Sequence, residues 1–135
     1  MPKFAATDYS VTINGTNFSD SLNSVELAQE ADNLETTAFG STWRTRIGGL
    51  KQATLTLNFM QDTAAGSVDA TLNPLLGSLA TVVIKNTSAT VSSTNPTYTM
   101  TALVTQYSPF ASSVGDISTF SVTWPVSGTV TRATA

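Results

Sequence analysis

The amino-acid sequence predicts a mainly β fold: a two-sheet antiparallel β-sandwich or partly closed barrel with one short flanking helix. Three observations support this prediction. Several segments alternate between apolar and polar side chains, as half-buried strands do. Thr, which favours strands, is abundant, while only 11% of the residues are charged. A single segment has helical spacing. With 135 residues, the chain is long enough for one core and too short for two, so we expect one domain over residues 1–135.

The N-terminal part predicts three short strands. Residues 9–13 alternate between apolar and polar side chains, and Asn14-Gly15, a strong hairpin signal, follows them. A return strand is expected over residues 16–18, and residues 24–30 predict a further strand. The side chains expected in or near the core are Tyr9, Val11, Ile13, Val25 and Leu27.

Downstream, strands are predicted over residues 51–60, 79–84, 97–104 and 117–124, with a last short strand over 128–133. The continuous apolar run at 79–84 predicts a strand buried on both faces. About seven strands are therefore expected in total. The clearest inward-facing sets are Ala53, Leu55, Leu57 and Phe59 in one strand, Tyr98, Met100, Ala102 and Val104 in the next, and Phe120, Val122 and Trp124 in the last.

One helix is predicted to start at Ser67, which can cap it, with Asp69 favourable in its first turn. Pro74 removes a backbone donor, so the helix should be short, kinked or restarted there. Gly77 supplies a stop signal. The apolar residues at helical spacing are Val68, Leu72, Leu75, Leu76 and Leu79.

Residues 30–50 follow no period and are interpreted as a loop of about twenty residues, a length that is uncommon unless a loop is functional or disordered. Acidic side chains come first and basic and aromatic ones follow. One interpretation is a solvated hairpin loop with its own salt bridges. We favour an arm that reaches a neighbouring subunit, because an aromatic and both charge signs occur together. The candidate contact residues are Glu30, Asp32, Glu35, Phe39, Trp43, Arg44 and Arg46.

Catalytic chemistry is poorly represented. The sequence has no His and no Cys, which excludes Ser-His-Asp and Cys-His catalysis and His- or Cys-containing zinc sites. Asp62 and Asp69 flank the helix entrance, where a loop and capping role is favoured over an acid–base pair. Gly48-Gly49 is a turn signal rather than a phosphate cradle. We therefore expect no enzyme activity, no metal and no cofactor.

The charge balance disfavours a nucleic-acid-binding protein. The net charge is -3, whereas a protein held by phosphate contacts needs a patch of Lys and Arg. The segment 43–46 could stack on and hold a nucleotide, but an interface role is favoured in an acidic chain. Residues 1–6 lack the apolar run of a signal peptide, and residues 79–84 are too short to span a bilayer. A soluble protein made in a cytoplasm is expected, with no membrane partner.

The order of these features resembles that of the tail tube (major tail) proteins of long-tailed phages. The resemblance extends from about Asn23 to Val130 and includes the strand at 24–27, the acidic-to-aromatic stretch at 32–46, the strand at 55–59, the helix at 70–77 and the strand at 117–124. The segments 35–40, 43–45 and 49–51 look like those of short tail proteins of phages that infect actinobacteria. This chain is small and shows no added immunoglobulin-like domain, which some relatives carry.

The resemblance implies a six-subunit ring in which sheets from all subunits form an inner barrel. Such rings stack into a tube through which DNA passes without specific binding. The implied partners are further copies of the chain and tape-measure, tail-terminator and tail-tip proteins; the implied location is the virion tail, after synthesis in the host bacterial cytoplasm. A minor tail protein, a head-decoration protein and a carbohydrate-binding β-sandwich stay open as alternatives.

Uncharged strand faces are expected to line or adjoin the lumen, because Lys or Arg there would hold passing DNA through its phosphates. These faces belong to the strands at 51–60 and 117–124. The predicted lumen-facing residues are Thr54, Thr56, Asn58, Thr119, Ser121 and Thr123.

Overall fold

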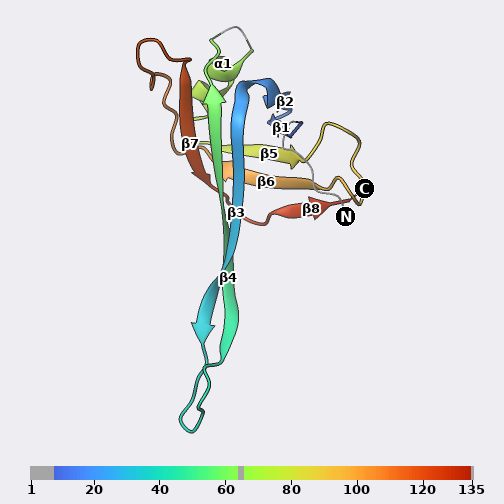
Figure 1. The fold of residues 1–135 in the computed structure, drawn as a ribbon, viewed down its shortest axis with the longest axis vertical. Coiled ribbons are helices and arrows are strands. Elements are labelled where there is room, and N and C mark those ends of the chain that lie inside the picture. Colours follow the sequence, from blue (N-terminus) through green and yellow to red (C-terminus); the bar gives the residue numbers. More distant parts are fainter. Residues whose placement is uncertain (1–7, 64–65, 135) are drawn as a thin grey trace.

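A computed structural model of the chain describes residues 8–63 and 66–134 (Figure 1). The prediction about a signal peptide concerns residues 1–6, which lie outside the described residues. The strands are β1 (Ser10–Ile13), β2 (Thr16–Asn17), β3 (Leu22–Glu35), β4 (Arg46–Met60), β5 (Leu79–Lys85), β6 (Thr97–Leu103), β7 (Thr119–Pro125) and β8 (Thr131–Ala133). The helical elements are α1 (Val68–Leu72) and the 3-10 turns Ser19–Ser21 and Asn73–Leu75.

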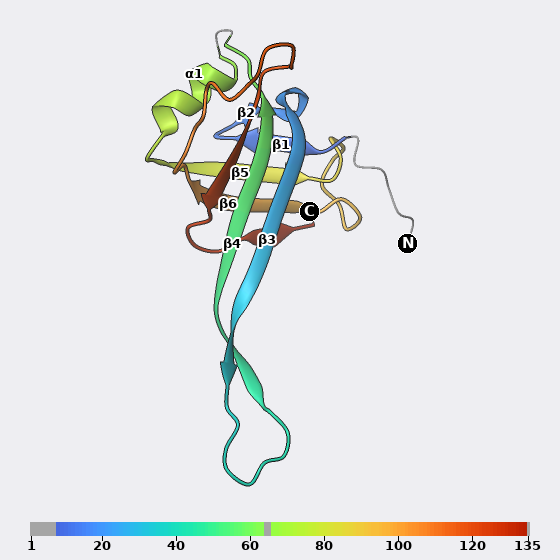
Figure 2. The ribbon, with the colours of Figure 1, turned by 60° about the vertical axis from the view of Figure 1, so that its left-hand side comes forward.

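The strands form two antiparallel sheets, which confirms the predicted mainly β sandwich. The five-stranded sheet has the order β2-β1-β5-β6-β8, and the three-stranded sheet has the order β3-β4-β7. The strands of the larger sheet run across those of the smaller one, and α1 covers one end of the sandwich (Figure 2). The described residues contain eight strands, against about seven predicted, and β2 forms where the return strand after Asn14-Gly15 was expected.

The core lies between the two sheets and follows the predicted alternation. In β4, residues Leu55, Leu57 and Phe59 are fully buried, and Val122 and Trp124 of the neighbouring strand β7 lie beside them on the same inner face. Trp124 donates its indole N–H to the Gln106 carbonyl at 3.0 Å, so its polar atom is satisfied inside the core. From the larger sheet, the buried apolar residues are Val11, Ile13, Ala80, Val82, Met100, Ala102 and Val104.

The first hairpin forms as predicted. Asn14 and Gly15 have φ values of 50° and 86°, which is the left-handed geometry that a two-residue turn between twisted strands requires. The Asn14 side-chain oxygen also accepts the Thr81 amide at 2.8 Å, and this bond ties the turn to β5.

The helix is short, as Pro74 predicts. α1 ends at Leu72 and a 3-10 turn containing Pro74 follows. Ser67 occupies the N-cap position but makes no side-chain capping hydrogen bond. The assignment of Leu76 and Leu79 to the helical face is wrong: both follow the helical elements and are about half exposed.

Two strand predictions need correction. β5 is buried on one face only, because Ala80 and Val82 point into the core while Leu79 is 55% exposed. A short apolar run does not distinguish a doubly buried strand from one whose outer face carries apolar residues. β7 begins at Thr119 rather than Ile117, which is 68% exposed in the preceding loop.

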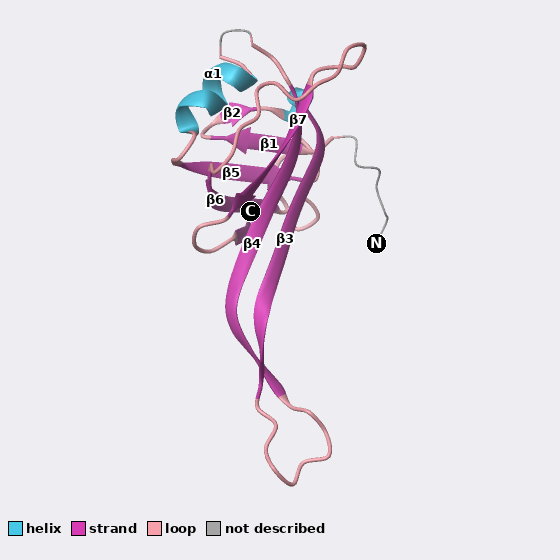
Figure 3. Ribbon diagram, turned by 90° about the vertical axis from the view of Figure 1, so that its left-hand side faces the viewer, coloured by secondary structure: helices cyan, strands magenta, loops and turns pink. Residues whose placement is uncertain are grey.

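The largest correction concerns residues 30–50, which are not a loop of about twenty residues. β3 continues to Glu35 and β4 begins at Arg46, so this stretch is a two-stranded ribbon closed by a loop at residues 36–45. The ribbon projects far beyond the sandwich as an arm (Figures 1 and 3). Both of its faces meet solvent, and apolar and polar residues do not alternate regularly along it, so the sequence does not mark it as strand.

Candidate assembly interface

The arm is shaped by a β-bulge at its midpoint. Between the Ala31 and Asn33 pairings, β4 has one residue more than β3. A bulge increases the local twist, and β3 and β4 cross each other on the way to the tip (Figure 1). Gly49 lies in the bulged segment, where an added Cβ would approach Asp32 Cβ to 3.0 Å and Leu34 Cδ1 to 3.1 Å.

Beyond the bulge the arm has one apolar and one charged face. Leu34 is paired with Ile47, and the next pair is Glu35 with Arg46. Because successive residues of a strand point to opposite sides, the two pairs occupy opposite faces. Leu34 and Ile47 are about half exposed, so the apolar face has no cover within the described part of the chain.

The loop at the arm tip is ordered by polar contacts that leave its aromatic residues bare. Thr36 and Thr45 join through a backbone hydrogen bond of 2.7 Å and through their hydroxyls, also 2.7 Å apart. The Thr45 amide further donates to the Thr37 hydroxyl at 3.0 Å. Phe39 is fully exposed and Trp43 is 83% exposed. A folded loop therefore presents two large aromatic side chains to solvent.

The predicted charged contact residues divide into two groups. Arg44 forms an ion pair of 2.9 Å with Glu35 of the same chain, so the hairpin does supply its own salt bridge, as the competing interpretation expected. Glu30 accepts a hydrogen bond from the Gln52 amide across the ribbon. Neither Arg46 nor Asp32 takes part in an ion pair among the described residues.

All six predicted lumen residues lie on the same face of the smaller sheet. Register pairs Thr56 with Thr123 and Asn58 with Ser121, and it places Thr54 and Thr119 at the two ends of the same set. Their chain neighbours Leu55, Leu57, Phe59, Phe120, Val122 and Trp124 are buried, so this set points away from the core. We call it the outer face.

The outer face is polar and lacks positive charge. Asn58 donates to the Asn23 side chain at 2.5 Å and accepts from the Ser121 hydroxyl at 3.0 Å, which links β3, β4 and β7 in one polar row. Glu26 of β3 pairs with Thr56 and therefore shares this face. The strand segments 22–30, 52–60 and 119–125 contain no Lys or Arg.

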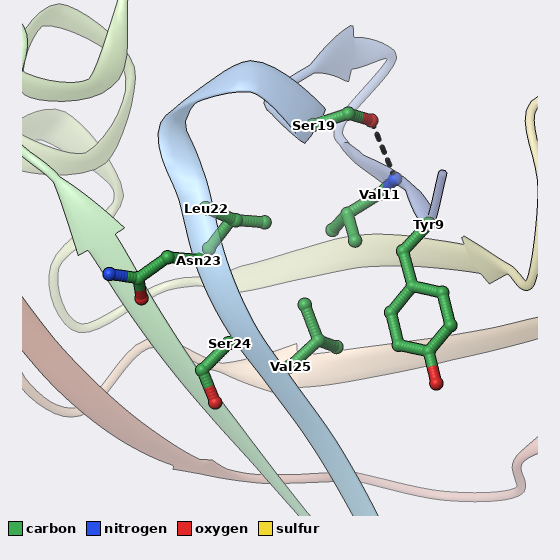
Figure 4. Close-up of a pocket in the computed structure, with 7 residues that line it drawn as sticks. All are labelled: Tyr9, Val11, Ser19, Leu22, Asn23, Ser24 and Val25. Carbon is green, nitrogen blue, oxygen red and sulfur yellow. Dashed lines mark hydrogen bonds between the residues drawn. The ribbon is translucent and has the colours of Figure 1, made fainter. Parts of the chain in front are cut away.

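A groove of about 320 Å³ lies between the first hairpin and β3 (Figure 4), and the Ser19 hydroxyl accepts the Val11 amide at 3.1 Å beside it. None of the lining side chains is charged; they are Tyr9, Val11, Ser19, Leu22, Asn23, Ser24 and Val25. Within residues 8–63 and 66–134 no cluster of acidic side chains could hold a metal ion, and no helix is both long and apolar enough to cross a bilayer.

Sequence reasoning missed a second exposed apolar surface, in the loop between β6 and β7. Phe110 and Val114 are almost fully exposed, and Ile117 is 68% exposed. The signal was available, since these apolar residues stand in an aperiodic stretch rich in Ser, as the aromatic residues of the arm do. This loop lies beside α1, at the end of the molecule opposite the arm tip (Figures 1 and 2).

Comparison with known proteins shows the fold. The sequence matches no protein-family model and no curated protein. The structure is similar to a chain in the virion of a native gene transfer agent particle, with a TM-score of 0.77 and 12% identity over 97% of this chain and 99% of that chain. It is also similar to a chain in the tail of an empty gene transfer agent particle, computed with helical refinement and C6 symmetry, with a TM-score of 0.67 and 15% identity over 85% of this chain and 83% of that chain. The fold that the tail tube resemblance implied is thus confirmed.

Proposed function

We propose that the chain is a structural subunit of a phage-type tail tube, which forms six-membered rings that stack into a conduit for DNA. The main observation behind this proposal is the arm, in which an ordered ribbon exposes Phe39 and Trp43. Large exposed apolar side chains grouped on one projection mark an interaction site rather than a monomer surface. The shared fold with a chain of a C6-symmetric tail supports six subunits in a ring.

The outer edge of β3 also supports assembly. β3 runs from Leu22 to Glu35 at the edge of its sheet, and no strand pairs with that edge in the described part of the chain. A long unpaired edge is a template for another strand and a liability in an isolated subunit. A neighbouring subunit in a closed ring would cover it, and heterologous contacts that close in this way generate rings.

The outer face is the proposed wall of the lumen. Its Thr, Ser and Asn side chains offer no positive charge to DNA, and Glu26 adds a negative charge that repels the DNA phosphates. DNA would then pass without the phosphate contacts that slow its release. The residues assigned to the lumen are Thr54, Thr56, Asn58, Thr119, Ser121 and Thr123.

The direct test is electron microscopy of the purified protein, with tubes or rings of regular diameter as the expected result. The double variant Trp43→Ala/Arg46→Glu should remain folded but fail to assemble, since both side chains are exposed on the arm. Arg132→Glu, the same charge change on exposed β8, is the matched control and should leave the tubes intact. Monomers alone from the unaltered protein would contradict the proposal.

The lumen assignment has its own test. Thr56→Lys should leave tubes that retain double-stranded DNA at low salt and release it as salt rises, because the new contacts are with phosphates. Thr131→Lys on exposed β8 serves as the control. Tubes of the Thr56 variant that show the same DNA affinity as the control would place the outer face away from the lumen.

Another structural position in a virion is the competing candidate, because one similar chain belongs to a whole virion. A minor tail or head-decoration protein should form rings or bind a capsid surface without forming long tubes by itself. A carbohydrate-binding module is less well supported: Trp124 is fully buried, and the exposed aromatic residues lie at the two ends of the molecule instead of forming one platform.

A further inference from the structure

We propose that the arm tip of one subunit docks on the β6–β7 loop, residues 105–118, of a second copy in the adjacent ring. The proposal rests on the tail-tube function and identifies the surface that receives the arm. Tip and loop lie at opposite ends of the long axis of the molecule (Figure 1). A contact between them therefore joins copies head to tail, and repetition along one axis produces a tube.

The β6–β7 loop is built to present apolar side chains. At its start, the Tyr107 hydroxyl donates to Asp69 of α1 at 2.5 Å and accepts from Gln61 at 3.1 Å. At its end, the Ser112 and Ser118 hydroxyls are 3.2 Å apart and hydrogen bonded. These polar contacts fix the base of the loop.

The apolar side chains of the same loop remain outside that polar framework. Phe110, Val114 and Ile117 project into solvent, with exposed fractions of 94%, 106% and 68%. The arm tip is similar: hydrogen bonds between threonines order the base of its loop, and its aromatic side chains are exposed. Two ordered surfaces with exposed apolar side chains can pack with little loss of conformational entropy.

The charges of the two ends are complementary. The arm beyond the bulge, residues 33–48, carries Arg44 and Arg46 against the single acidic residue Glu35, so it has a net positive charge. The opposite end carries Asp62, Asp69 and Asp116 on the segments beside and within the loop, while residues 52–84 and 86–131 contain no Lys or Arg. Attraction between unlike ends and repulsion between like ends favour head-to-tail stacking over tip-to-tip contact.

The small size of each contact suits stacking of rings rather than of single subunits. An aromatic side chain buries about 150–250 Å², so Phe39 and Trp43 together supply less than the roughly 800 Å² per partner of a stable complex. Six such contacts between two rings act together, and multivalency then strengthens the association without new contacts. Rings should therefore form before tubes.

Cysteine cross-linking tests the contact directly, because the natural sequence has no Cys. The variant Phe39→Cys/Val114→Cys places one thiol on the tip and one on the loop, and a short bifunctional thiol reagent should then produce a ladder of covalent multimers. The matched control is Phe39→Cys/Thr90→Cys, with the second thiol on an exposed loop at the side of the sandwich. It should give no ladder.

The outcomes separate this inference from the proposed function. Normal tubes without the 39–114 ladder, or with an equal ladder in the control, overturn the docking surface and leave the tube standing. An unaltered protein that forms neither rings nor tubes overturns both. A charge exchange adds a second readout: Arg46→Glu and Asp116→Arg should each raise the concentration needed for tubes by about tenfold, and their combination should restore it toward the original value.

Discussion

The sandwich and the arm share the strands β3 and β4 but are stabilised in different ways. In the sandwich, β4 alternates between buried and half-buried residues from Ala53 to Met60. In the arm, from Arg46 to Gln52, only Gly49 is partly covered. The sandwich finds its partner surface in the other sheet, whereas the arm has none within the described residues. The difference agrees with the proposal that the sandwich stabilises the chain and the arm serves assembly.

The two tryptophans provide the sharpest test of this comparison. Trp124→Ala empties a fully buried site between the sheets and should lower the free energy of unfolding by about 3–5 kcal/mol. Total stability is roughly 5–15 kcal/mol for a domain, so this variant should be close to unfolding. Urea denaturation followed by circular dichroism measures the loss.

Trp43→Ala is the matched control on the arm. Its side chain is 83% exposed, so the free energy of unfolding of the monomer should change by less than about 0.5 kcal/mol. Its assembly into tubes should nevertheless fail. Equal destabilisation by the two substitutions would mean that the arm contributes to the core of the subunit, contrary to the comparison.

Removal of the Tyr107 hydroxyl, which contacts α1 at one end of the sandwich, is expected to lower the free energy of unfolding by a smaller amount. Tyr107→Phe removes the hydrogen bonds to Asp69 and Gln61 and should cost about 1 kcal/mol, discounted for partial exposure. Faster amide exchange in residues 105–118 is expected as well. Unchanged exchange in the loop would show that other contacts hold it.

The same hydroxyl predicts a pH dependence. Burial, the first cause, and the hydrogen bond to Asp69 raise the pKa of Tyr107 above its usual value of 10.0. A raised pKa in the folded state means that this stabilisation is complete below the unfolded pKa and is lost as pH rises through the folded pKa. The stability difference between the original protein and Tyr107→Phe should be constant below about pH 9 and shrink above pH 10. Unfolding measured across this range checks it.

Substitutions at the bulge in the arm are expected to change stability by a similar amount. Gly49→Ala places a Cβ against Asp32 and Leu34, whereas Gly48→Ala meets nothing within 4 Å. Replacing Gly in a strand should stabilise by about 0.5–1 kcal/mol where space allows, so Gly48→Ala should slow amide exchange in the arm. Gly49→Ala should lose that gain and impair tube formation. Identical behaviour of the two variants would show that the bulge tolerates a side chain.

The sequence predicted the elements that bury one face inside the chain. The strands around Leu57, Met100 and Val122 alternate because their inner side chains face a second sheet, and Pro74 limited the helix as expected. The sequence did not predict the arm as a ribbon, because neither of its faces is buried and its apolar and polar residues therefore do not alternate regularly. The exposed outer face of Leu79 in β5 escaped for the reverse reason: it is apolar without being buried.

The candidate interface was predicted in part. The composition of the arm predicted Phe39 and Trp43 as contact residues; the structure shows that both are exposed, and the contact itself stays a prediction. Pairing could not be read from composition: Glu35 was expected to reach across an interface, but the ribbon places it beside Arg44 of the same chain. Phe110 was missed although it stands, like the aromatic residues of the arm, among polar residues in an aperiodic stretch.

The smallest expected effect concerns that Glu35–Arg44 pair. Its side chains are 50% and 72% exposed, and exposed pairs contribute only about 0.2–1 kcal/mol. Arg44→Gln should therefore slightly accelerate amide exchange at the arm tip at low salt, and the effect should disappear at about 1 M salt, where charges are screened beyond roughly 3 Å. Glu35→Gln should do the same if the pair acts only within the arm. If Arg44→Gln also abolishes tubes while Glu35→Gln does not, Arg44 binds the next subunit and Glu35 only positions it.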